Sequence, residues 1–522
     1  MSNFAEAMKN MIDDIYNVSI TENGAVGYKT TNQPLLDMNF KVSSYRSKSE
    51  DEIINDFKAA FSIDSTLAMQ WLFYIRDCRE GVGERRLFRV IIKWLAKNYP
   101  SVVFAVIPFI PFYGRFDDLL ELIEDVPYFI KEEVLSLVKE QLADDIDNYL
   151  IGKPISLLAK WLPSANASSK ETKRKATIIR KYLGLSEKKY RKILTSLRKK
   201  LNVVEVKMSA NEWDKIDYET VPSKANLIYG SAFIRNDEER RTEYLEQVLS
   251  GKKEIHSSVL FPHEIVSKYR NCRVENDTLE ALWKSLPDLV DKNSNTIVVA
   301  DGSGSMWSRV DPKSNTCALD VADALAIYFA ERASGQFKDK YITFSENPQL
   351  VDLSKGKSLK DKLDIAEEYS EIANTNIEAV FDLILNTAIE NNMPQSELPQ
   401  NILIISDMEF DRCAYCGKPF RNAFDRERYL VERPSKKLFE VISEKYKNAG
   451  YKMPRLIFWN VASRTNTIPL KENELGVALI SGFSTNLVKM VMSEKNDPYE
   501  CLLETLNSPR YLPIKREIND LF

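Results

Sequence analysis

The hydrophobic pattern of the chain changes its period near residue 295, and this change restricts the folds that the sequence can adopt. From about residue 50 to 290, apolar residues recur at three- and four-residue spacing, as at Leu67, Trp71, Leu72 and Ile75. This spacing predicts amphipathic helices. After residue 295, short apolar runs alternate with helical stretches, which is typical of a doubly wound, mostly parallel sheet. We therefore expect an α-helical array followed by a Rossmann-like α/β domain.

The helical half is divided by helix-breaking residues into short segments. These residues are Gly81, Gly83, Pro100, Pro108, Pro111, Pro154 and Pro163. Successive amphipathic helices with short connections predict stacked, HEAT-like helix pairs. The sequence does not repeat at a fixed period, so we expect an irregular array.

The α/β half contains six candidate strands and three clear candidate helices. The strands are expected at residues 296–300, 341–344, 349–352, 401–405, 455–459 and 477–480, and the helices at 317–332, 377–389 and 437–447. A polar run at 291–295 precedes the first strand. We therefore divide the chain into an N-terminal extension (1–50), a helical-repeat domain (51–290) and the α/β domain (291–522).

The overall composition points to no particular ligand. The 522 residues include 72 bases and 76 acids, a net charge of −4, so a polyanion partner is indicated only where bases cluster locally. The two histidines, His256 and His263, leave little scope for histidine catalysis. Six scattered cysteines fit a reducing compartment. The chain begins without a signal-peptide pattern and lacks a long apolar run, so we expect a cytoplasmic protein with no membrane partner.

Polar residues follow two of the expected strands and predict a metal site. The strand at 296–300 ends in Asp301, with Ser303 and Ser305 on the next turn, and a later strand ends before Asp407. Thr375 precedes an expected helix. In open α/β sheets, ligands bind at the carboxyl ends of the strands. Two carboxylates and three hydroxyls are hard oxygen ligands, which suit Mg²⁺ or Mn²⁺ better than zinc. The alternative is that the Asp-x-Ser-x-Ser pattern occurs by chance and caps a helix.

The glycines at 302 and 304 also raise the possibility of a nucleotide-binding loop. A P-loop requires a lysine at its end, and none follows here. A dinucleotide-binding loop requires a third glycine, where this chain has Trp307. Both nucleotide interpretations are therefore rejected.

Residues 170–200 form a strongly basic segment, with thirteen bases and only Glu171 and Glu187 against them. The bases are Lys170, Lys173, Arg174, Lys175, Arg180, Lys181, Lys188, Lys189, Arg191, Lys192, Arg198, Lys199 and Lys200. All but Lys170 are candidate RNA-binding residues, and Tyr182 and Tyr190 could stack on unpaired nucleobases of an RNA. The alternatives are a solvated helical hairpin, or one docked on acids of the same chain.

Several motifs resemble known families. The pattern formed by Asp301, Ser303, Ser305, Thr375 and Asp407 resembles the metal-ion-dependent adhesion site (MIDAS) of von Willebrand factor A domains, although Ala373 and Asn374 replace the glycines usual before the threonine. The arginine-rich segment 76–86 and the segments 113–118, 160–163 and 221–225 are similar to TROVE-type Ro ribonucleoproteins, most closely to the branch called DUF2828. The resemblance implies helical repeats that bind small structured RNAs and single-stranded RNA ends.

These observations predict a non-catalytic RNA-binding protein with a divalent-metal site and no expected DNA specificity. No nucleophile–base pair suggests an enzyme. The first alternative is an adaptor whose bound metal captures an acidic side chain of a partner protein, and the second is an accessory component encoded by a virus. Cys413 and Cys416 form a lone CxxC pair in a polar insertion, which we expect to be incidental unless zinc bridges two chains there.

Overall fold

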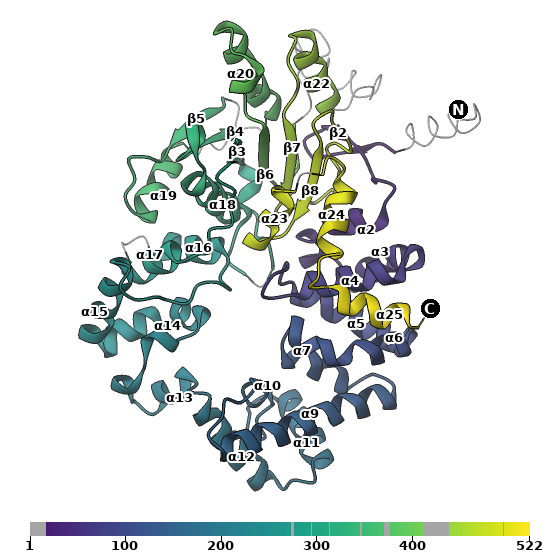
Figure 1. Cartoon of the computed structure of the whole chain (residues 1–522), viewed down its shortest axis with the longest axis vertical. Helices are drawn as coiled ribbons and strands as arrows, with labels where there is room; N and C mark the ends of the chain where they lie inside the picture. The colour runs from purple at the N-terminus through teal and green to yellow at the C-terminus, as the bar shows by residue number, and fades with distance from the viewer. Residues whose placement is uncertain are drawn as a thin grey trace. The chain divides into compact units, whose positions relative to one another are not determined.

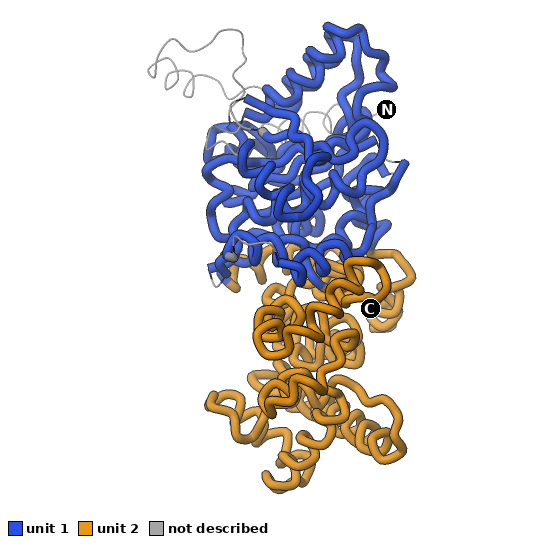
Figure 2. Tube along the Cα trace, turned by 90° about the vertical axis from the view of Figure 1, so that its left-hand side faces the viewer, with its two compact units in different colours: residues 1–49, 260–505 blue, residues 50–259, 506–522 orange. Residues whose placement is uncertain are grey.

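The computed structural model of the chain forms two compact units (Figure 2). It describes residues 17–272, 276–293, 295–312, 314–344, 347–369, 376–411, 438–493 and 495–521. The first unit comprises residues 1–49 and 260–505, and the second comprises 50–259 and 506–522. These boundaries differ from those expected from the sequence, because the N-terminal residues and 260–290 belong to the α/β unit and the C-terminal residues to the helical unit.

Six strands of the described residues form the sheet of the first unit (Figure 1). They are β3 (Thr296–Asp301), β4 (Lys340–Phe344), β5 (Gln349–Asp352), β6 (Asn401–Ser406), β7 (Arg455–Asn460) and β8 (Val477–Ser481). Their order is β5-β4-β3-β6-β7-β8. All neighbours run parallel except β5, which is antiparallel to β4. The six predicted strands are thus confirmed, and the first of them lies in the middle of the sheet.

Helices cover both faces of this sheet. Consecutive residues of a strand point to opposite faces. On β7, Trp459 packs edge-on against Phe329 of one helix, whereas Phe458 packs against Phe439 of another. The main helices of the unit are α16 (Pro262–Cys272), α17 (Asp277–Lys284), α18 (Ala318–Arg332), α19 (Leu359–Glu368), α20 (Ile377–Glu390), α22 (Leu438–Asn448), α23 (Val488–Val491) and α24 (Pro498–Leu506).

The N-terminal residues 17–49 pack against the β7–β8 side of the sheet. They form β1 (Ser19–Ile20), β2 (Val26–Gly27) and α2 (Pro34–Phe40). The buried Asn460 side chain donates to the carbonyl of Phe40 at 2.8 Å, and the backbone N–H of Ser43 donates to the Ser481 hydroxyl at 2.9 Å. These contacts explain why the segment expected to be an extension is part of the α/β unit.

The second unit is a succession of helices (Figure 1), and several neighbours in sequence pack together, such as α3 with α4, α5 with α6 and α14 with α15. They are α3 (Glu50–Ile63), α4 (Ser65–Arg76), α5 (Arg85–Asn98), α6 (Pro100–Val106), α7 (Ile110–Tyr113), α8 (Phe116–Leu119), α9 (Tyr128–Leu150), α10 (Leu158–Trp161), α11 (Lys170–Tyr182), α12 (Glu187–Lys200), α13 (Val204–Ser209), α14 (Ser223–Asn236), α15 (Glu238–Leu249) and α25 (Leu512–Asn519). None of the helices in the described part of the chain is long and apolar enough to cross a membrane.

Segments 76–86 and 113–118, two of those that resemble Ro proteins, pack together. The buried Asp118 carboxylate accepts from Arg76 Nε at 2.8 Å and from Arg89 Nε at 2.7 Å. A side chain at Gly81 would collide with the carbonyl of Tyr74, and a Cβ at Gly114 would lie 2.7 Å from Asp118 Oδ2. The glycines therefore allow the arginine-rich turn to close around Asp118.

The C-terminal residues pack on the same turn. Arg510 forms an ion pair with the buried Asp77, with Nη2 2.9 Å from Oδ1, and Tyr511 donates to the same carboxylate at 3.1 Å. Helix α25, which follows these two residues, packs on α4 and α6. These contacts explain why 506–522 belong to the helical unit.

Candidate metal site and nucleic-acid surface

Four of the five predicted metal-binding residues, Asp301, Ser303, Ser305 and Asp407, lie where β3 and β6 end. The two strands are parallel neighbours, and Ala300 pairs with Ile405, so Asp301 lies beside Ser406 and close to Asp407. After β3 the chain continues to β4 on one side, and it later returns to β6 on the other side of β3. This reversal of strand order is the place where open α/β sheets bind ligands.

Asp301 is fully buried and held in one orientation. Its Oδ1 accepts from the backbone N–H of Ser303 at 2.9 Å, and its Oδ2 accepts from the Ser406 hydroxyl at 2.6 Å. The Ser406 hydroxyl also accepts from the backbone N–H of Met408 at 2.9 Å. Ser406 thus links the ends of the two strands, although the sequence pattern did not single it out.

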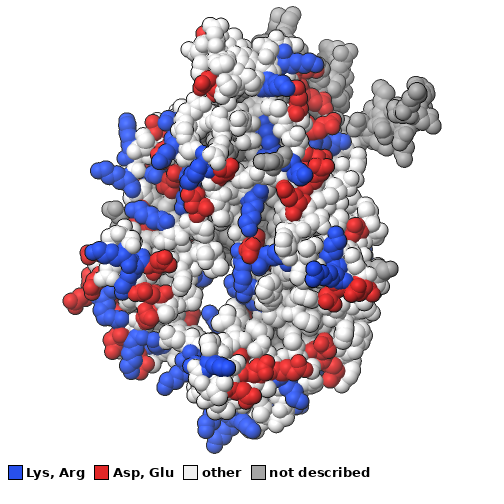
Figure 3. All heavy atoms as spheres, viewed as in Figure 1, with Lys and Arg blue, Asp and Glu red and all other residues white. Residues whose placement is uncertain are grey.

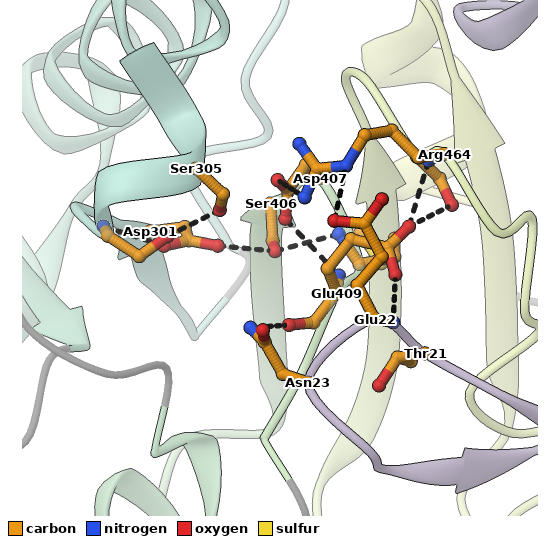
Figure 4. A network of polar contacts seen from close by, with 12 residues as sticks. Thr21, Glu22, Asn23, Asp301, Ser305, Ser406, Asp407, Glu409 and Arg464 are labelled. Atoms are coloured by element: carbon orange, nitrogen blue, oxygen red, sulfur yellow. Dashed lines mark hydrogen bonds and ion pairs between the residues drawn. The ribbon is translucent and has the colours of Figure 1, made fainter. Parts of the chain in front are cut away.

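Of the two serines of the Asp-x-Ser-x-Ser turn, Ser305 points towards Asp407 (Figure 4). The hydroxyl oxygens of Ser303 and Ser305 lie 3.0 Å apart. Ser305 also forms a hydrogen bond with the buried Asp407. Asp407 Oδ1 accepts from the backbone N–H of Glu409 at 3.2 Å, whereas its Oδ2 makes no hydrogen bond with the described residues. Its close partner among the described residues is the guanidinium of Arg464, whose Nη2 lies 3.4 Å away in an ion pair. A buried carboxylate oxygen without a hydrogen bond can accept an additional ligand.

The two carboxylates destabilise each other's charge. Burial raises the pKa of Asp301 above its usual value, and the neighbouring Asp407 carboxylate raises it further. Burial also raises the pKa of Asp407, although Ser305 and the nearby Arg464 guanidinium oppose this shift. A cation placed between the two groups would favour both charged forms.

The donor set therefore fits a hard divalent cation such as Mg²⁺ or Mn²⁺. Two carboxylates and two hydroxyls supply only oxygen ligands, and a Cβ at Gly302 would meet nothing within 4 Å, so the turn has room beside it. Within the described residues, no three His, Cys, Asp or Glu side chains form a metal-binding cluster. The predicted site does not need one, because hydroxyls complete it. Thr375 lies outside the described residues.

A second layer of polar residues surrounds Asp407 and was not predicted from the sequence. The fully buried Glu409 accepts from the backbone N–H groups of Arg464 and Thr465, each at 2.8 Å, and from that of Glu22 at 2.9 Å. Met408, between the two acids, has a positive φ of 61°. Such a conformation is unfavourable for a residue with a side chain and is common near functional sites. It directs Glu409 towards the loop after β7.

The predicted basic segment forms the consecutive helices α11 and α12 with a short turn between them (the hairpin), and four of its twelve candidate RNA-binding residues are engaged within the chain. Arg174 Nε lies 2.6 Å from Glu124, and Lys175 Nζ lies 3.1 Å from Glu121. Arg198 donates to the carbonyls of residues 159 and 162 and to a serine hydroxyl. Lys200 donates to the carbonyl of Gly152 at 3.0 Å. These four residues therefore serve the fold.

Tyr190 does not fit the stacking role expected from the sequence. It is fully buried, and its hydroxyl donates to the carbonyl of Pro163 at 3.0 Å. The expectation was wrong because Tyr190 lies on the same helical face as Leu194 and Leu197, which are also buried. Tyr182 is half-buried and remains a candidate for stacking.

Other bases of the hairpin point to solvent. Figure 3 shows Lys and Arg side chains over α12, next to acidic side chains over α9. Eight basic side chains form no hydrogen bond or ion pair with the described residues: Lys170, Lys173, Arg180, Lys181, Lys188, Lys189, Arg191 and Lys192. Lys199 is exposed and lies near Glu212. The hairpin thus presents a dense positive charge that its own unit only partly neutralises.

Comparison with known proteins identifies the family. Residues 21–123 and 117–300 match the family described as Domain of unknown function (DUF2828), and together these stretches span more than half of the 522 residues. The chain belongs to the DUF2828 family. Residues 295–507 of this DUF2828 protein match a second family, Domain of unknown function (DUF7788). The chain is also 31% identical over 527 residues to "Uncharacterized protein L728" of Acanthamoeba polyphaga mimivirus, covering 94% of this chain and 87% of the relative.

The match confirms the DUF2828 part of the predicted resemblance. The likeness to Ro proteins and to von Willebrand factor A domains stays a prediction. Cys413 and Cys416 lie outside the described residues, so their expected lack of a role also stays a prediction.

Proposed function

We propose that this DUF2828 protein is a non-catalytic RNA-binding protein that holds RNA on the α11–α12 hairpin and a divalent cation in its α/β unit. The observation that carries the proposal is the set of eight basic side chains without a partner in the described residues. Clustered like charges repel one another, and a polyanion relieves that repulsion. The backbone phosphates of RNA would supply the negative charge.

Single-stranded or structured RNA is the favoured polyanion, on two grounds. The half-buried Tyr182 lies at the end of α11, next to Arg180 and Lys181, which have no partner among the described residues. An unpaired nucleobase could stack on Tyr182 while its phosphate contacts one of these basic side chains. The predicted likeness to TROVE-type Ro proteins supports the same class of ligand.

A salt titration of binding tests this proposal. Each phosphate contact with single-stranded RNA lowers log K by roughly 0.7 per unit of log salt, so about six contacts predict a slope near −4. Lys188→Glu combined with Lys192→Glu should weaken binding of all RNA sequences alike and flatten the slope by about 1.4. Fluorescence anisotropy with a labelled RNA measures both effects.

The matched control is Lys355→Glu with Lys357→Glu, two exposed lysines of the α/β unit. It changes the net charge by the same amount and should leave the slope unchanged. Equal weakening by both double variants would show that only net charge matters. A wild-type protein without salt-dependent binding would refute RNA as the ligand.

For the α/β unit, we propose a von Willebrand factor A-type, Rossmann-like domain whose Mg²⁺ or Mn²⁺ ligands are Asp301, Ser303, Ser305 and Asp407, with Thr375 as a further candidate. The strand order and the Asp-x-Ser-x-Ser turn support this identification. Asp301→Ala should abolish Mg²⁺ binding in calorimetry. Asp352→Asn, which removes a carboxylate at the end of β5, is the control, because Asp352 pairs with the start of β4 and lies at the opposite edge of the sheet. Unchanged Mg²⁺ affinity in Asp301→Ala would disprove the assignment.

An adaptor that captures an acidic side chain of a partner protein through the metal is the second candidate function. The partial exposure of Ser305 favours it, because a partner's carboxylate could reach a cation held by this hydroxyl. If this adaptor function holds, Asp301→Ala should abolish the capture of protein partners while the hairpin variants leave it intact.

A further inference from the structure

Arg464 places a positive charge of the chain's own beside the proposed metal site (Figure 4). Its Nη2 lies 3.4 Å from Asp407 Oδ2, the buried oxygen that makes no hydrogen bond with the described residues. Asp407 is fully buried, whereas the Arg464 side chain is 35% exposed. The Arg464 side chain is therefore partly solvated, whereas the carboxylate that it faces is not.

Two further acids determine where this guanidinium lies. Buried Glu409 fixes the backbone of Arg464 by accepting from its N–H at 2.8 Å. Glu22, on the N-terminal segment, binds the side chain of Arg464, with Oε2 2.7 Å from Nε. Because the N–H of Glu22 also donates to Glu409 at 2.9 Å, one buried carboxylate anchors both partners of the Arg464–Glu22 ion pair.

We infer that Arg464 is a built-in counter-ion of Asp407 that competes with the divalent cation, and that Glu22 weakens this competition by neutralising Arg464. This inference rests on the proposed metal site. A bound cation and the guanidinium repel each other, and this repulsion is only partly screened because Asp407 is fully buried, so Arg464 lowers the affinity for the metal. An anion that pairs with the guanidinium reduces that repulsion.

The inference predicts opposite effects for the two partners. Arg464→Gln should tighten Mg²⁺ binding by roughly tenfold, because it removes the competing charge but keeps a polar side chain. Glu22→Gln should weaken Mg²⁺ binding by a few-fold, because Arg464 is then left without its anion. The backbone N–H of Glu22 remains, so the anchoring of the segment on Glu409 is preserved. In the double variant, the effect of Glu22→Gln should largely disappear.

Calorimetry of Mg²⁺ binding to the full chain is the test, with Arg464→Lys as the charge-preserving control. That control should bind Mg²⁺ within about threefold of the wild type. A second readout is the melting temperature in EDTA, which should fall in Arg464→Gln because the Asp301–Asp407 pair loses its counter-ion. Saturating Mg²⁺ should then raise the melting temperature of this variant more than that of the wild type.

The outcomes separate the inference from the metal proposal. If Mg²⁺ binds, but Arg464→Gln leaves the affinity unchanged or weakens it, Arg464 does not compete and the inference is wrong while the metal site stands. If neither the wild type nor any variant binds Mg²⁺, the metal proposal itself fails and the inference falls with it. Should Arg464→Gln fail to fold, Glu22→Gln decides: weaker binding supports competition, and unchanged or tighter binding overturns it.

Discussion

Replacing Asp118 tests whether the arginine-rich turn is a structural element or a ligand-binding one. Asp118 is fully buried and accepts from two arginine side chains, Arg76 and Arg89, and from the backbone N–H of Arg115. Asp118→Asn keeps the size of the side chain but removes its charge. Arg76, which is only 2% exposed, would keep its charge without a carboxylate partner.

The expected loss of stability is large, because breaking a buried ion pair from one side costs about 3–5 kcal/mol. The neighbouring Asp117 is a matched control. It pairs with the same Arg89, at 2.7 Å, but its side chain is 21% exposed. A partly solvated pair contributes about 0–1 kcal/mol, so Asp117→Asn should be nearly neutral.

Thermal unfolding followed by circular dichroism distinguishes the two variants. For a unit of ~150–250 residues, each kcal/mol shifts the melting temperature by about 2–4 °C. Asp118→Asn should therefore lower the helical transition by about 6–20 °C, and Asp117→Asn by less than about 4 °C. Equally small shifts in both variants would refute the structural role and would leave the arginines of the turn available to bind phosphate.

Three further variants test other parts of the structure. Tyr190→Phe loses one buried hydrogen bond, so it should cost about 1 kcal/mol in a melting experiment and leave RNA affinity unchanged in anisotropy. Arg510→Gln leaves the buried Asp77 without its ion-pair partner, so trypsin should release the C-terminal segment faster. Burial alone would raise the pKa of Glu121, but hydrogen bonds from Lys93 and a second lysine lower it overall. A lowered pKa stabilises the folded protein fully above the usual glutamate pKa, and this stabilisation is lost as the pH falls through the lowered pKa. The melting temperature of Glu121→Gln should therefore change less with pH in the acid range than that of the wild type.

The strands could be predicted closely because each is a buried apolar run with a polar residue at its end. The run at 401–405 becomes β6 with one more residue, and the run at 296–300 becomes β3 with Asp301 as its last residue. Parallel strands bring their carboxyl ends to the same edge, so the pattern predicted Asp301 and Asp407 at one edge of the sheet, whereas the direct pairing of β3 with β6 is known only from the structure. Hydrophobic periodicity thus predicts the fold class and part of the candidate site.

Charge counting over residues 170–200 was less informative, because it ignores the direction of each side chain. Tyr190, Leu194 and Leu197 follow one another at spacings of four and three, which marks the buried face of α12. Applying that spacing to the basic segment would have removed Tyr190 from the stacking candidates. Arg198, next to this face, donates to the carbonyls of Ala159 in α10 and of Leu162 just after it, a contact that no local pattern indicates.

The polar contacts around Asp407 could not be predicted, because the residues that make them lie far apart in the sequence. Glu22 and Glu409 are separated by 387 residues, yet they share a hydrogen bond, and Arg464 joins them from the loop after β7. None of the three belongs to a recognisable motif. Only the folding of the N-terminal segment onto the sheet brings them together, and that packing depends on contacts such as Asn460 to Phe40.

The two proposed sites are both places where the charges of the chain itself do not balance. The net charge of −4 hides two features: a basic hairpin, in which eight basic side chains have no partner among the described residues, and, in the other unit, two buried carboxylates that make each other's ionisation less favourable. Both arrangements destabilise the folded state unless the charges are neutralised, because like charges close together oppose a compact structure. Arg464 relieves the acid pair only in part, since its side chain is partly solvated and is shared with Glu22. An anion bound to the hairpin would reduce the repulsion between its basic side chains, and a cation at the sheet edge would reduce the repulsion between the two carboxylates. These two surfaces are therefore better candidates for ligand binding than the arginine-rich turn, whose charges are paired within the chain.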